Sequence, residues 1–155
     1  MKSITTDVLI IGEGLTGLSL AFFLRNLNIK VKIIEANANV GGRINTKYNT
    51  NQAPVELGAT WLIEQQTNIL SLLKALDIPV FQQYYGNTAI YQPNNSQATQ
   101  LVQLPPNSSV SYRVANGTYT IIKTLAEKLE ENTIVCNQSV NSIKLLFNGL
   151  VANTN

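Results

Sequence analysis

The hydrophobic pattern of the first 35 residues predicts a strand, a helix and a second strand. Residues 7–11 are a short, continuous apolar run, which is typical of a buried parallel strand. Apolar residues recur at helical spacing over residues 15–27 and predict a helix that ends near residues 26–28. Residues 30–35 form a second β-prone segment that ends on Glu35. Since crossovers between parallel strands are almost always right-handed, we expect the two strands to lie parallel in one sheet.

The middle of the chain predicts a loop, a helix and a small antiparallel insertion. Residues 36–50 contain adjacent glycines and are expected to form a loop. Residues 68–76 carry apolar residues at helical spacing, and we expect this helix to stop before Pro79 because proline disfavours helical geometry in the preceding residue. Residues 80–104 are aromatic and β-prone, with Asn and Gln turns, and predict antiparallel strands.

The last third of the chain predicts a helix, a strand and a hairpin. Residues 119–131 place apolar side chains on one helical face. Residues 134–135 are expected to form a strand, and residues 140–152 a hairpin that turns at Asn148-Gly149. These elements together predict an α/β fold with a Rossmann-like parallel sheet, a β-rich insertion and a C-terminal hairpin.

Residues 12–17 match the glycine pattern G-x-G-x-x-G, and their position makes the match informative. The segment follows one predicted strand, opens a predicted helix and precedes a second strand that ends in an acid. Gly12 permits the tight turn, Gly14 lets a pyrophosphate approach the backbone, and Gly17 lets the helix pack closely on the strand. The first helical turn, with Leu15 and Thr16, offers free N–H donors to phosphates.

The acid that ends the second strand selects among dinucleotides. Glu35 can accept hydrogen bonds from both ribose hydroxyls, and its charge disfavours a 2'-phosphate, so FAD or NAD fits better than NADP. The alternative is a glycine turn and a solvated glutamate with no ligand. Glu13 lies inside the pattern, at a position from which its side chain can point to solvent.

Composition removes several other classes of function. The 155 residues are 45% hydrophobic, enough for one domain with its own core. The net charge of +2 with scattered basic residues gives no footprint for nucleic acid or an anionic membrane, which favours a small-molecule partner. Glycines interrupt the N-terminal apolar run, so neither a signal peptide nor a membrane span is expected and the predicted location is cytoplasmic.

The chain offers little chemistry of its own. It has one cysteine, Cys136, and no histidine, so an internal disulfide, the usual zinc sites and Ser/His or Cys/His catalytic pairs are all ruled out. We expect no metal and nominate no catalytic acid or base. The chemistry must come from a cofactor or lie elsewhere.

Three further segments carry a resemblance to a known family. Glu35-Ala36, residues 40–43 (Val-Gly-Gly-Arg) and residues 55–61 (Val-Glu-Leu-Gly-Ala-Thr-Trp) resemble the flavin amine oxidase superfamily, which includes monoamine and polyamine oxidases. Residues 116–140 are similar to that family's second pass into its cofactor domain. The resemblance covers nearly the whole chain and implies FAD as cofactor and a small-molecule amine as substrate.

The resemblance also implies a role for each matching residue. The glycines of residues 12–17 would hold the pyrophosphate, and Glu35-Ala36 would lie at the adenosine ribose. Gly42 and Arg43, with Gly41 before them, would lie along the phosphate and ribityl region. Four residues would approach the flavin ring: Gly58, Ala59, Thr60 and Trp61. Val140 would contact the adenine through its backbone.

Each of these roles has an alternative. Arg43 can be a surface cation, Trp61 a core aromatic and Val140 an ordinary strand residue. The resemblance divides the chain into an FAD-binding region at 1–78, a β-rich insertion at 79–113 that begins a substrate domain, and a return to the FAD-binding domain at 114–155.

The chain ends at Asn155 without the stretch that closes the FAD site in the family. We therefore expect the N-terminal part of an amine oxidase-like enzyme, without activity of its own and with apolar surface that favours homo-oligomers. Two alternatives stay open: part of a carotenoid-desaturase-like or porphyrinogen-oxidase-like flavoenzyme, or a non-catalytic dinucleotide-binding module.

Overall fold

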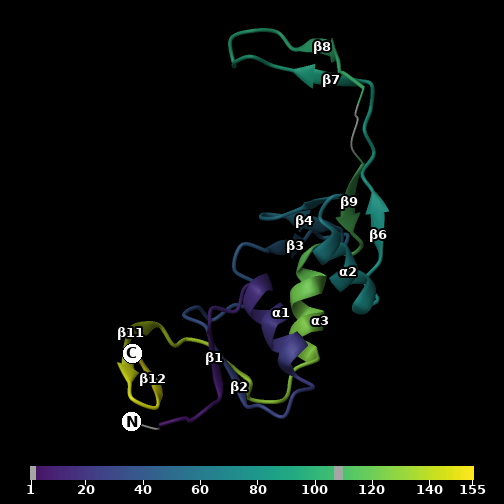
Figure 1. Ribbon diagram of the computed structural model, residues 1–155. Helices are drawn as coiled ribbons and strands as arrows, with labels where there is room; N and C mark the ends of the chain where they lie inside the picture. Colours follow the sequence, from purple (N-terminus) through teal and green to yellow (C-terminus); the bar gives the residue numbers. More distant parts are fainter. Residues whose placement is uncertain (1–2, 107–109) are drawn as a thin grey trace.

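A three-stranded parallel sheet forms the base of the molecule in the computed structural model, which describes residues 3–106 and 110–155 (Figure 1). Its strands are β1 (Val8–Ile11), β2 (Val31–Ile34) and β10 (Ile134–Val135), and β2 lies in the centre. All pairings are parallel, with Ile10 opposite Ile33. The expected parallel strand-helix-strand unit and the Rossmann-like α/β class are confirmed.

Two helices pack against one face of this sheet, α1 (Leu15–Leu24) and α3 (Tyr119–Glu127). They lie side by side across the sheet in Figure 1, and their apolar faces meet Ile10 and Ile33 in one core. Alternation along β1 turns Ile10 into this core and leaves Leu9 and Ile11 exposed on the other face. The sheet is therefore covered by helices on one side.

The remaining elements extend away from the sheet. Above α1 and α3 lie α2 (Thr67–Ala75) and a second sheet, in which β9 (Ser111–Val114) pairs antiparallel with β5 (Trp61–Ile63) and β6 (Val80–Gln82). Three two-stranded units complete the fold: β3 (Thr46–Tyr48) with β4 (Pro54–Glu56), β7 (Thr88–Tyr91) with β8 (Gln100–Gln103), and β11 (Val140–Leu146) with β12 (Gly149–Thr154). Figure 1 shows the β7–β8 hairpin standing off as an arm at one end, and both termini near the β11–β12 hairpin at the other.

Several expected boundaries are wrong. Residues 36–50 are not entirely loop, because Thr46–Tyr48 pairs with Pro54–Glu56. The antiparallel strands expected in residues 80–104 are present, but they do not form one unit, since β6 joins the second sheet and β7 and β8 form a separate hairpin. The C-terminal hairpin turns at Phe147-Asn148, one position early, because Gly149 already pairs with Leu146.

Two predicted helices are shorter than expected. The α1 helix ends at Leu24, where the Arg25 guanidinium folds back to donate to the Phe22 carbonyl and covers the Phe22 ring. The α3 helix ends at Glu127, because the N–H groups of Lys128 and Leu129 bond to carbonyls three residues back and tighten the last turn. The α2 helix agrees with the expectation to within one residue at each end. Among the residues that the structure describes, no helix is long and apolar enough to cross a bilayer.

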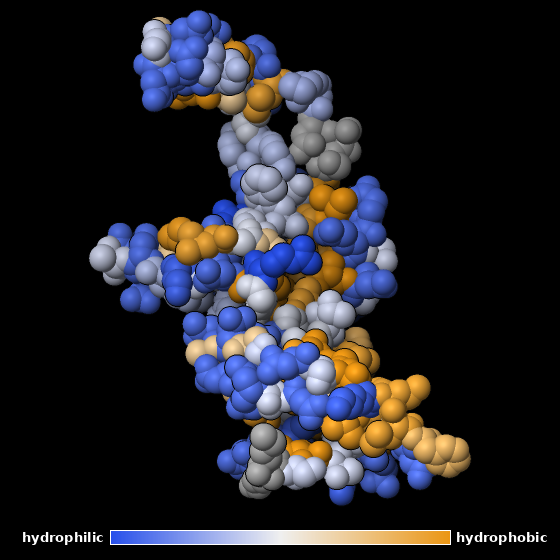
Figure 2. Space-filling view, turned by 90° about the vertical axis from the view of Figure 1, so that its left-hand side faces the viewer, coloured by the Kyte–Doolittle hydropathy of each residue, from blue (hydrophilic) through white to orange (hydrophobic). Residues whose placement is uncertain are grey.

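Large apolar side chains reach the surface in many places. Figure 2 shows orange, hydrophobic areas among the blue ones on the face that it presents. On the body of the fold the exposed set includes Ile11, 51% exposed on β1, and Phe23, 62% exposed on α1. These residues provide the apolar surface that the sequence led us to expect; whether it drives self-association stays a prediction.

A carboxylate network joins the β3–β4 hairpin to the start of α3. Glu56 accepts hydrogen bonds from the Thr46 hydroxyl at 2.7 Å, the Thr118 N–H at 2.6 Å and the Thr118 hydroxyl at 3.1 Å. The Thr46 hydroxyl in turn accepts from the N–H of Tyr119 at 3.0 Å. Both threonines are buried, and the negative charge lies at the positive end of the helix.

Glu56→Gln should therefore lower the free energy of unfolding by about 2 kcal/mol, because a neutral amide replaces charge-assisted acceptors in a buried network. Urea unfolding of the variant and the parent measures the difference. Glu127→Gln, which removes an exposed carboxylate on the same helix, is the control and should change stability by less than about 0.5 kcal/mol. Equal effects of the two substitutions would contradict the role given to Glu56.

Candidate dinucleotide-binding site

The glycines of the glycine loop, residues 12–17, differ in backbone conformation and in the space around them. Gly12 has φ of +97°, a conformation that residues with a side chain rarely adopt. Gly14 precedes α1 as its N-cap, and a Cβ placed on it would meet no atom within 4 Å. At Gly17, by contrast, a Cβ would lie well inside van der Waals contact with the Gly12 carbonyl oxygen and 3.2 Å from Ile10. Thus Gly17 serves packing, whereas Gly14 faces open space.

Glu35 fastens the end of β2 to this loop. One carboxylate oxygen accepts the Glu13 N–H at 2.9 Å, and the other accepts the backbone and side-chain N–H groups of Asn37, both at 2.8 Å. The hydrogen bond from the Glu13 backbone is the main reason that the pKa of Glu35 lies below its usual value; burial opposes this shift and the Asn37 bonds add to it. The side chain is 8% exposed, so an ionised carboxylate lies beside the glycine loop.

The Glu13 side chain does not point to solvent. Its exposed fraction is 0%. One oxygen accepts the Cys136 thiol at 3.6 Å, and the other is a buried atom without a partner among the described residues. Burial raises the pKa of Glu13 from 4.5 to about 7; the thiol bond opposes the rise and the charge of Glu35 adds to it.

The Gly-Gly-Arg loop, residues 41–43, lies directly against the glycine loop. The Gly41 N–H donates to the Glu13 carbonyl at 3.0 Å, and Gly41 and Gly14 form a parallel bridge. Gly41 and Gly42 have φ of +108° and +58°. A Cβ on Gly42 would come within 3.6 Å of the Gly14 Cα, so the two loops approach each other through backbone atoms.

The segment from Gly58 to Trp61 continues from the Gly-Gly-Arg loop. The Ala59 N–H donates to the Arg43 carbonyl at 3.2 Å, and a Cβ on Gly58 would collide with that same carbonyl oxygen. The Thr60 hydroxyl donates to the Gly58 carbonyl at 3.0 Å. Trp61 is 67% exposed at the start of β5, so it is not a core aromatic.

The segment before Val140 adjoins the opposite end of the site. The Gln138 N–H donates to the Glu35 carbonyl at 2.9 Å, and the Asn137 N–H donates to the Asn37 carbonyl at 3.2 Å. Val140 follows as the first residue of β11 and is half-buried.

The residues that the sequence nominated thus form one band of contacting segments. Hydrogen bonds connect Gln138 to the Glu35 backbone and the Glu35 carboxylate to the glycine loop. Backbone bonds then connect that loop to the Gly-Gly-Arg loop, and the Gly-Gly-Arg loop to residues 58–59. Leu15 is half-buried and Thr16 exposed in the first turn of α1, and Ala36, Gly42 and Arg43 are exposed. Their predicted ligand roles remain predictions.

Sequence reasoning missed the buried carboxyl of Glu13 and the network around Glu56. The buried side chain of Glu13 contacts Cys136, which lies 123 positions away in the chain. No local pattern carries that information. Glu56 was part of a quoted motif, but its role at the start of α3 depends on Thr118.

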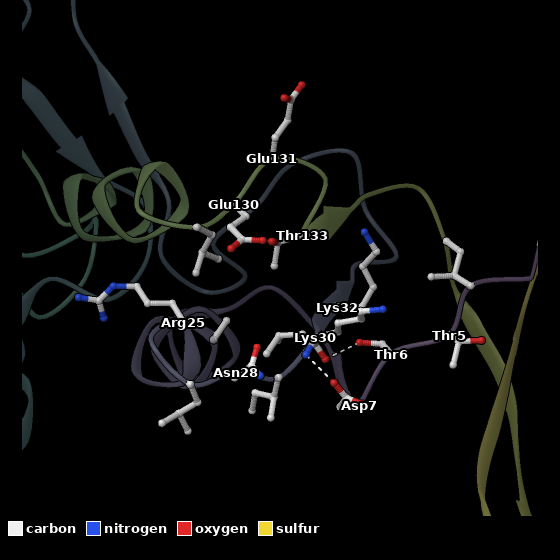
Figure 3. Close-up of a pocket in the computed structure, with 16 residues that line it drawn as sticks. Thr5, Thr6, Asp7, Arg25, Asn28, Lys30, Lys32, Glu130, Glu131 and Thr133 are labelled. Atoms are coloured by element: carbon white, nitrogen blue, oxygen red, sulfur yellow. Dashed lines mark hydrogen bonds between the residues drawn. The ribbon is translucent and has the colours of Figure 1, made fainter.

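An open cavity of about 670 Å³ lies elsewhere, at the amino ends of β1 and β2 (Figure 3). The Asp7 carboxylate accepts the Lys30 N–H at 2.6 Å, and the Thr6 hydroxyl donates to the Lys30 carbonyl at 2.6 Å. These bonds join the two strands. Rossmann-like folds bind nucleotides at the carboxyl ends of their strands. This cavity lies at the amino ends and therefore does not correspond to a nucleotide site. No cluster of potential metal ligands occurs within residues 3–106 and 110–155.

Comparison with known proteins agrees with this geometry. The family model described as an NAD(P)-binding Rossmann-like domain matches residues 10–76. Polyamine oxidase 3 of Oryza sativa subsp. japonica is 34% identical over 83 residues, and flavin-containing amine oxidase A of Sus scrofa is 38% identical over 76 residues. The chain is similar in sequence to parts of these flavin-containing amine oxidases.

The similarity covers about half of this chain and a small part of each of these amine oxidases. The matched regions make up 52% and 49% of this chain but only 17% and 14% of the two relatives. A solved structure of wild-type putrescine oxidase bound to putrescine superposes with a TM-score of 0.81 at 17% identity, covering 99% of this chain and 56% of that one. This likeness shows that the chain shares the fold of the corresponding part of that structure.

The geometry of the glycine loop predicts stability losses of different size for the same change at two glycines. Gly17→Ala should lower the free energy of unfolding by about 3 kcal/mol, because the new Cβ overlaps a backbone oxygen that cannot rotate away. Gly14→Ala should cost about 1 kcal/mol or less, since its Cβ enters open space at a helix N-cap. Urea unfolding followed by circular dichroism measures both. Similar losses would contradict the assignment of close packing to Gly17 alone.

The buried Glu13 carboxyl predicts a pH dependence of stability. Between pH 4.5 and about 7 the unfolded chain loses this proton while the folded chain keeps it. The free energy of unfolding should therefore fall as pH rises through this window, by up to about 3 kcal/mol, and stay low above it. Glu35 acts in the opposite direction: its contribution is present above its unfolded pKa and is lost only at more acidic pH, as its lowered folded pKa is passed.

Urea unfolding at pH 5 and pH 8 isolates the contribution of Glu13. The difference in stability between the two pH values should shrink in Glu13→Gln relative to the parent, because the amide does not titrate. In Glu127→Gln, where the lost carboxylate is exposed, the difference should stay as in the parent. A parent whose stability does not fall between these pH values would show that Glu13 ionises normally.

Proposed function

We propose that this chain binds FAD and supplies the adenosine- and pyrophosphate-binding part of a flavin-dependent amine oxidase. The observation that carries the proposal is the continuous band of segments from Val140 through Glu35, the glycine loop and the Gly-Gly-Arg loop to Trp61. The relatedness to flavin-containing amine oxidases supports FAD over other dinucleotides.

The glycine loop fits the pyrophosphate of this cofactor. Added Cβ atoms on Gly12 and Gly14 would meet nothing within 4 Å, which leaves room for a ligand at the backbone. Gly14 has no side chain to cap α1, and the first turn of the helix contains no acid. Its N–H groups and partial positive charge are therefore available to phosphates.

Glu35 fits the adenosine ribose. Its Oε2 accepts one hydrogen bond within the protein and so keeps acceptor capacity for a ribose hydroxyl. The lowered pKa of Glu35 keeps the carboxylate charged, which disfavours the 2'-phosphate of NADP. Ala36 lies beside it, and the Val140 backbone would border the adenine.

The other half of the band would follow the cofactor toward its flavin. Gly42 and the exposed Arg43 would lie along the phosphates and ribityl chain, where the guanidinium can donate charge-assisted hydrogen bonds. Residues 58–61 would approach the ring. When bound, the flavin would supply the redox chemistry of amine oxidation, as a hydride acceptor that oxygen can reoxidise.

The same proposal assigns the regions of the chain. Residues 1–78 and 114–155 would form the FAD-binding portion, and residues 79–113 the start of a substrate domain. The exposed apolar side chains favour association with further protein surface, including a second copy of the chain. We further propose a cytoplasmic location and a small-molecule amine as substrate.

Binding of FAD tests the proposal most simply. The fluorescence of FAD should be quenched or shifted when the parent protein is added. The Gly14→Val variant should not bind FAD, because its branched side chain fills the space of the phosphates. Glu35→Gln should bind 10- to 100-fold more weakly through loss of a charge-assisted acceptor. Glu127→Gln, far from the band, should bind as the parent does, and circular dichroism checks that each variant is folded.

Two outcomes would contradict the assignment. If Gly14→Val bound FAD as tightly as the parent, the glycine loop would not hold the pyrophosphate. A parent that prefers NADP to FAD would remove Glu35 from the ribose site.

A further inference from the structure

The Glu13 carboxyl belongs to the glycine loop but has no part in the ligand contacts proposed above. Its side chain is fully buried, its Oε1 has no hydrogen-bond partner among the described residues, and its Oε2 has only the thiol of Cys136. Buried polar atoms normally have partners, and an ionised carboxylate needs several. The site therefore suits a carboxylic acid better than a carboxylate.

Glu13 is also the point where four segments of the site meet. Its N–H donates to Glu35, its carbonyl accepts from Gly41, its side chain contacts Cys136, and the next residue begins the helix N-terminus. A negative charge on Glu13 would thus act on the glycine loop, the Gly-Gly-Arg loop and the Glu35 carboxylate together.

In the described part of the chain, the titratable groups that face Glu13 keep their charge near neutral pH. From the end of β2 comes Glu35, whose lowered pKa keeps it ionised. From the end of β10 comes Cys136, whose pKa is raised by burial and by the negative charge of Glu13, so the thiol stays protonated. Gly41, from the third segment, has no side chain.

We propose that Glu13 is protonated when FAD occupies the glycine loop, so that this protein binds FAD more tightly at acidic than at alkaline pH. The inference rests on the FAD binding proposed above. An ionised Glu13 would add a second negative charge beside Glu35, beneath a loop that must accept a dianionic pyrophosphate. Because linkage is reciprocal, binding of FAD at alkaline pH should draw a proton from solvent onto Glu13.

The test is calorimetric titration of FAD into the full chain at pH 5.5, 7 and 8.5. The affinity should fall about tenfold across this range, as expected for one unit charge acting on bound phosphate through several ångströms of protein. FAD itself keeps its phosphates ionised throughout. The binding heat at pH 8 should also depend on the ionisation enthalpy of the buffer. The difference in heat between two such buffers should correspond to the uptake of a fraction of a proton.

Variants separate this effect from other titrations. Glu13→Gln should bind FAD with nearly constant affinity and without proton uptake, and Glu127→Gln should keep the pH dependence of the parent. Cys136→Ala removes the thiol that favours the charged form and should shift the midpoint to higher pH, which provides a second route if Glu13→Gln does not fold.

The outcomes distinguish the two proposals. If the parent binds FAD with constant affinity from pH 5.5 to 8.5, or if Glu13→Gln keeps the pH dependence, the role of Glu13 is wrong and FAD binding stands. If the parent binds no FAD at any of the three pH values, the proposed function fails, and the inference about Glu13 fails with it.

Discussion

The hydrogen bond from the Glu13 N–H to the Glu35 carboxylate is the contact on which the site depends. It joins the turn after β1 to the end of β2, and so fixes the glycine loop against the sheet. Two further contacts hold the same turn: the close approach of Gly17 to Gly12, and the hydrogen bond from the Gly41 N–H to the Glu13 carbonyl. With these three contacts in place, α1 begins after Gly14, beside open space and without a side-chain cap.

This arrangement brings together two carboxyl groups with opposite behaviour. Glu35 accepts three hydrogen bonds and stays ionised below its usual pKa, whereas Glu13 is buried with one weak donor and holds its proton to about pH 7. Hydrogen bonds stabilise one charge and desolvation opposes the other. The ionised member is the one beside the proposed ribose position, and the protonated member lies under the loop, so the site carries one negative charge instead of two.

The fold could be predicted from the sequence where short-range patterns determine it. The apolar run of β1, the helical spacing of α1 and the glycine loop between them are local features, and all three elements form in the expected order, although α1 ends earlier than its pattern predicts. The failures lie where partners are distant. Thr46–Tyr48 is a polar segment that becomes a strand only through pairing with Pro54–Glu56, and Val80–Gln82 becomes part of the second sheet only through pairing with β9.

The candidate site shows the same division. Gly12, Gly14, Gly17 and Glu35 follow from the spacing of one motif, and their geometry fits separate physical demands. The burial of Glu13 could not be predicted, because it depends on the packing of distant segments, including the one that carries Cys136 after β10. A charged residue inside a glycine motif is expected to be solvated until the element that covers it is known.

Hydrogen exchange with and without FAD tests the central claim most directly, because it reports which backbone N–H groups the ligand covers. We predict slower exchange at residues 13–17 and 41–43 when FAD is added, with the cavity at Asp7 and Lys30 unchanged. Protection confined to that cavity, or no change in residues 13–17 under conditions where FAD binds, would contradict the account.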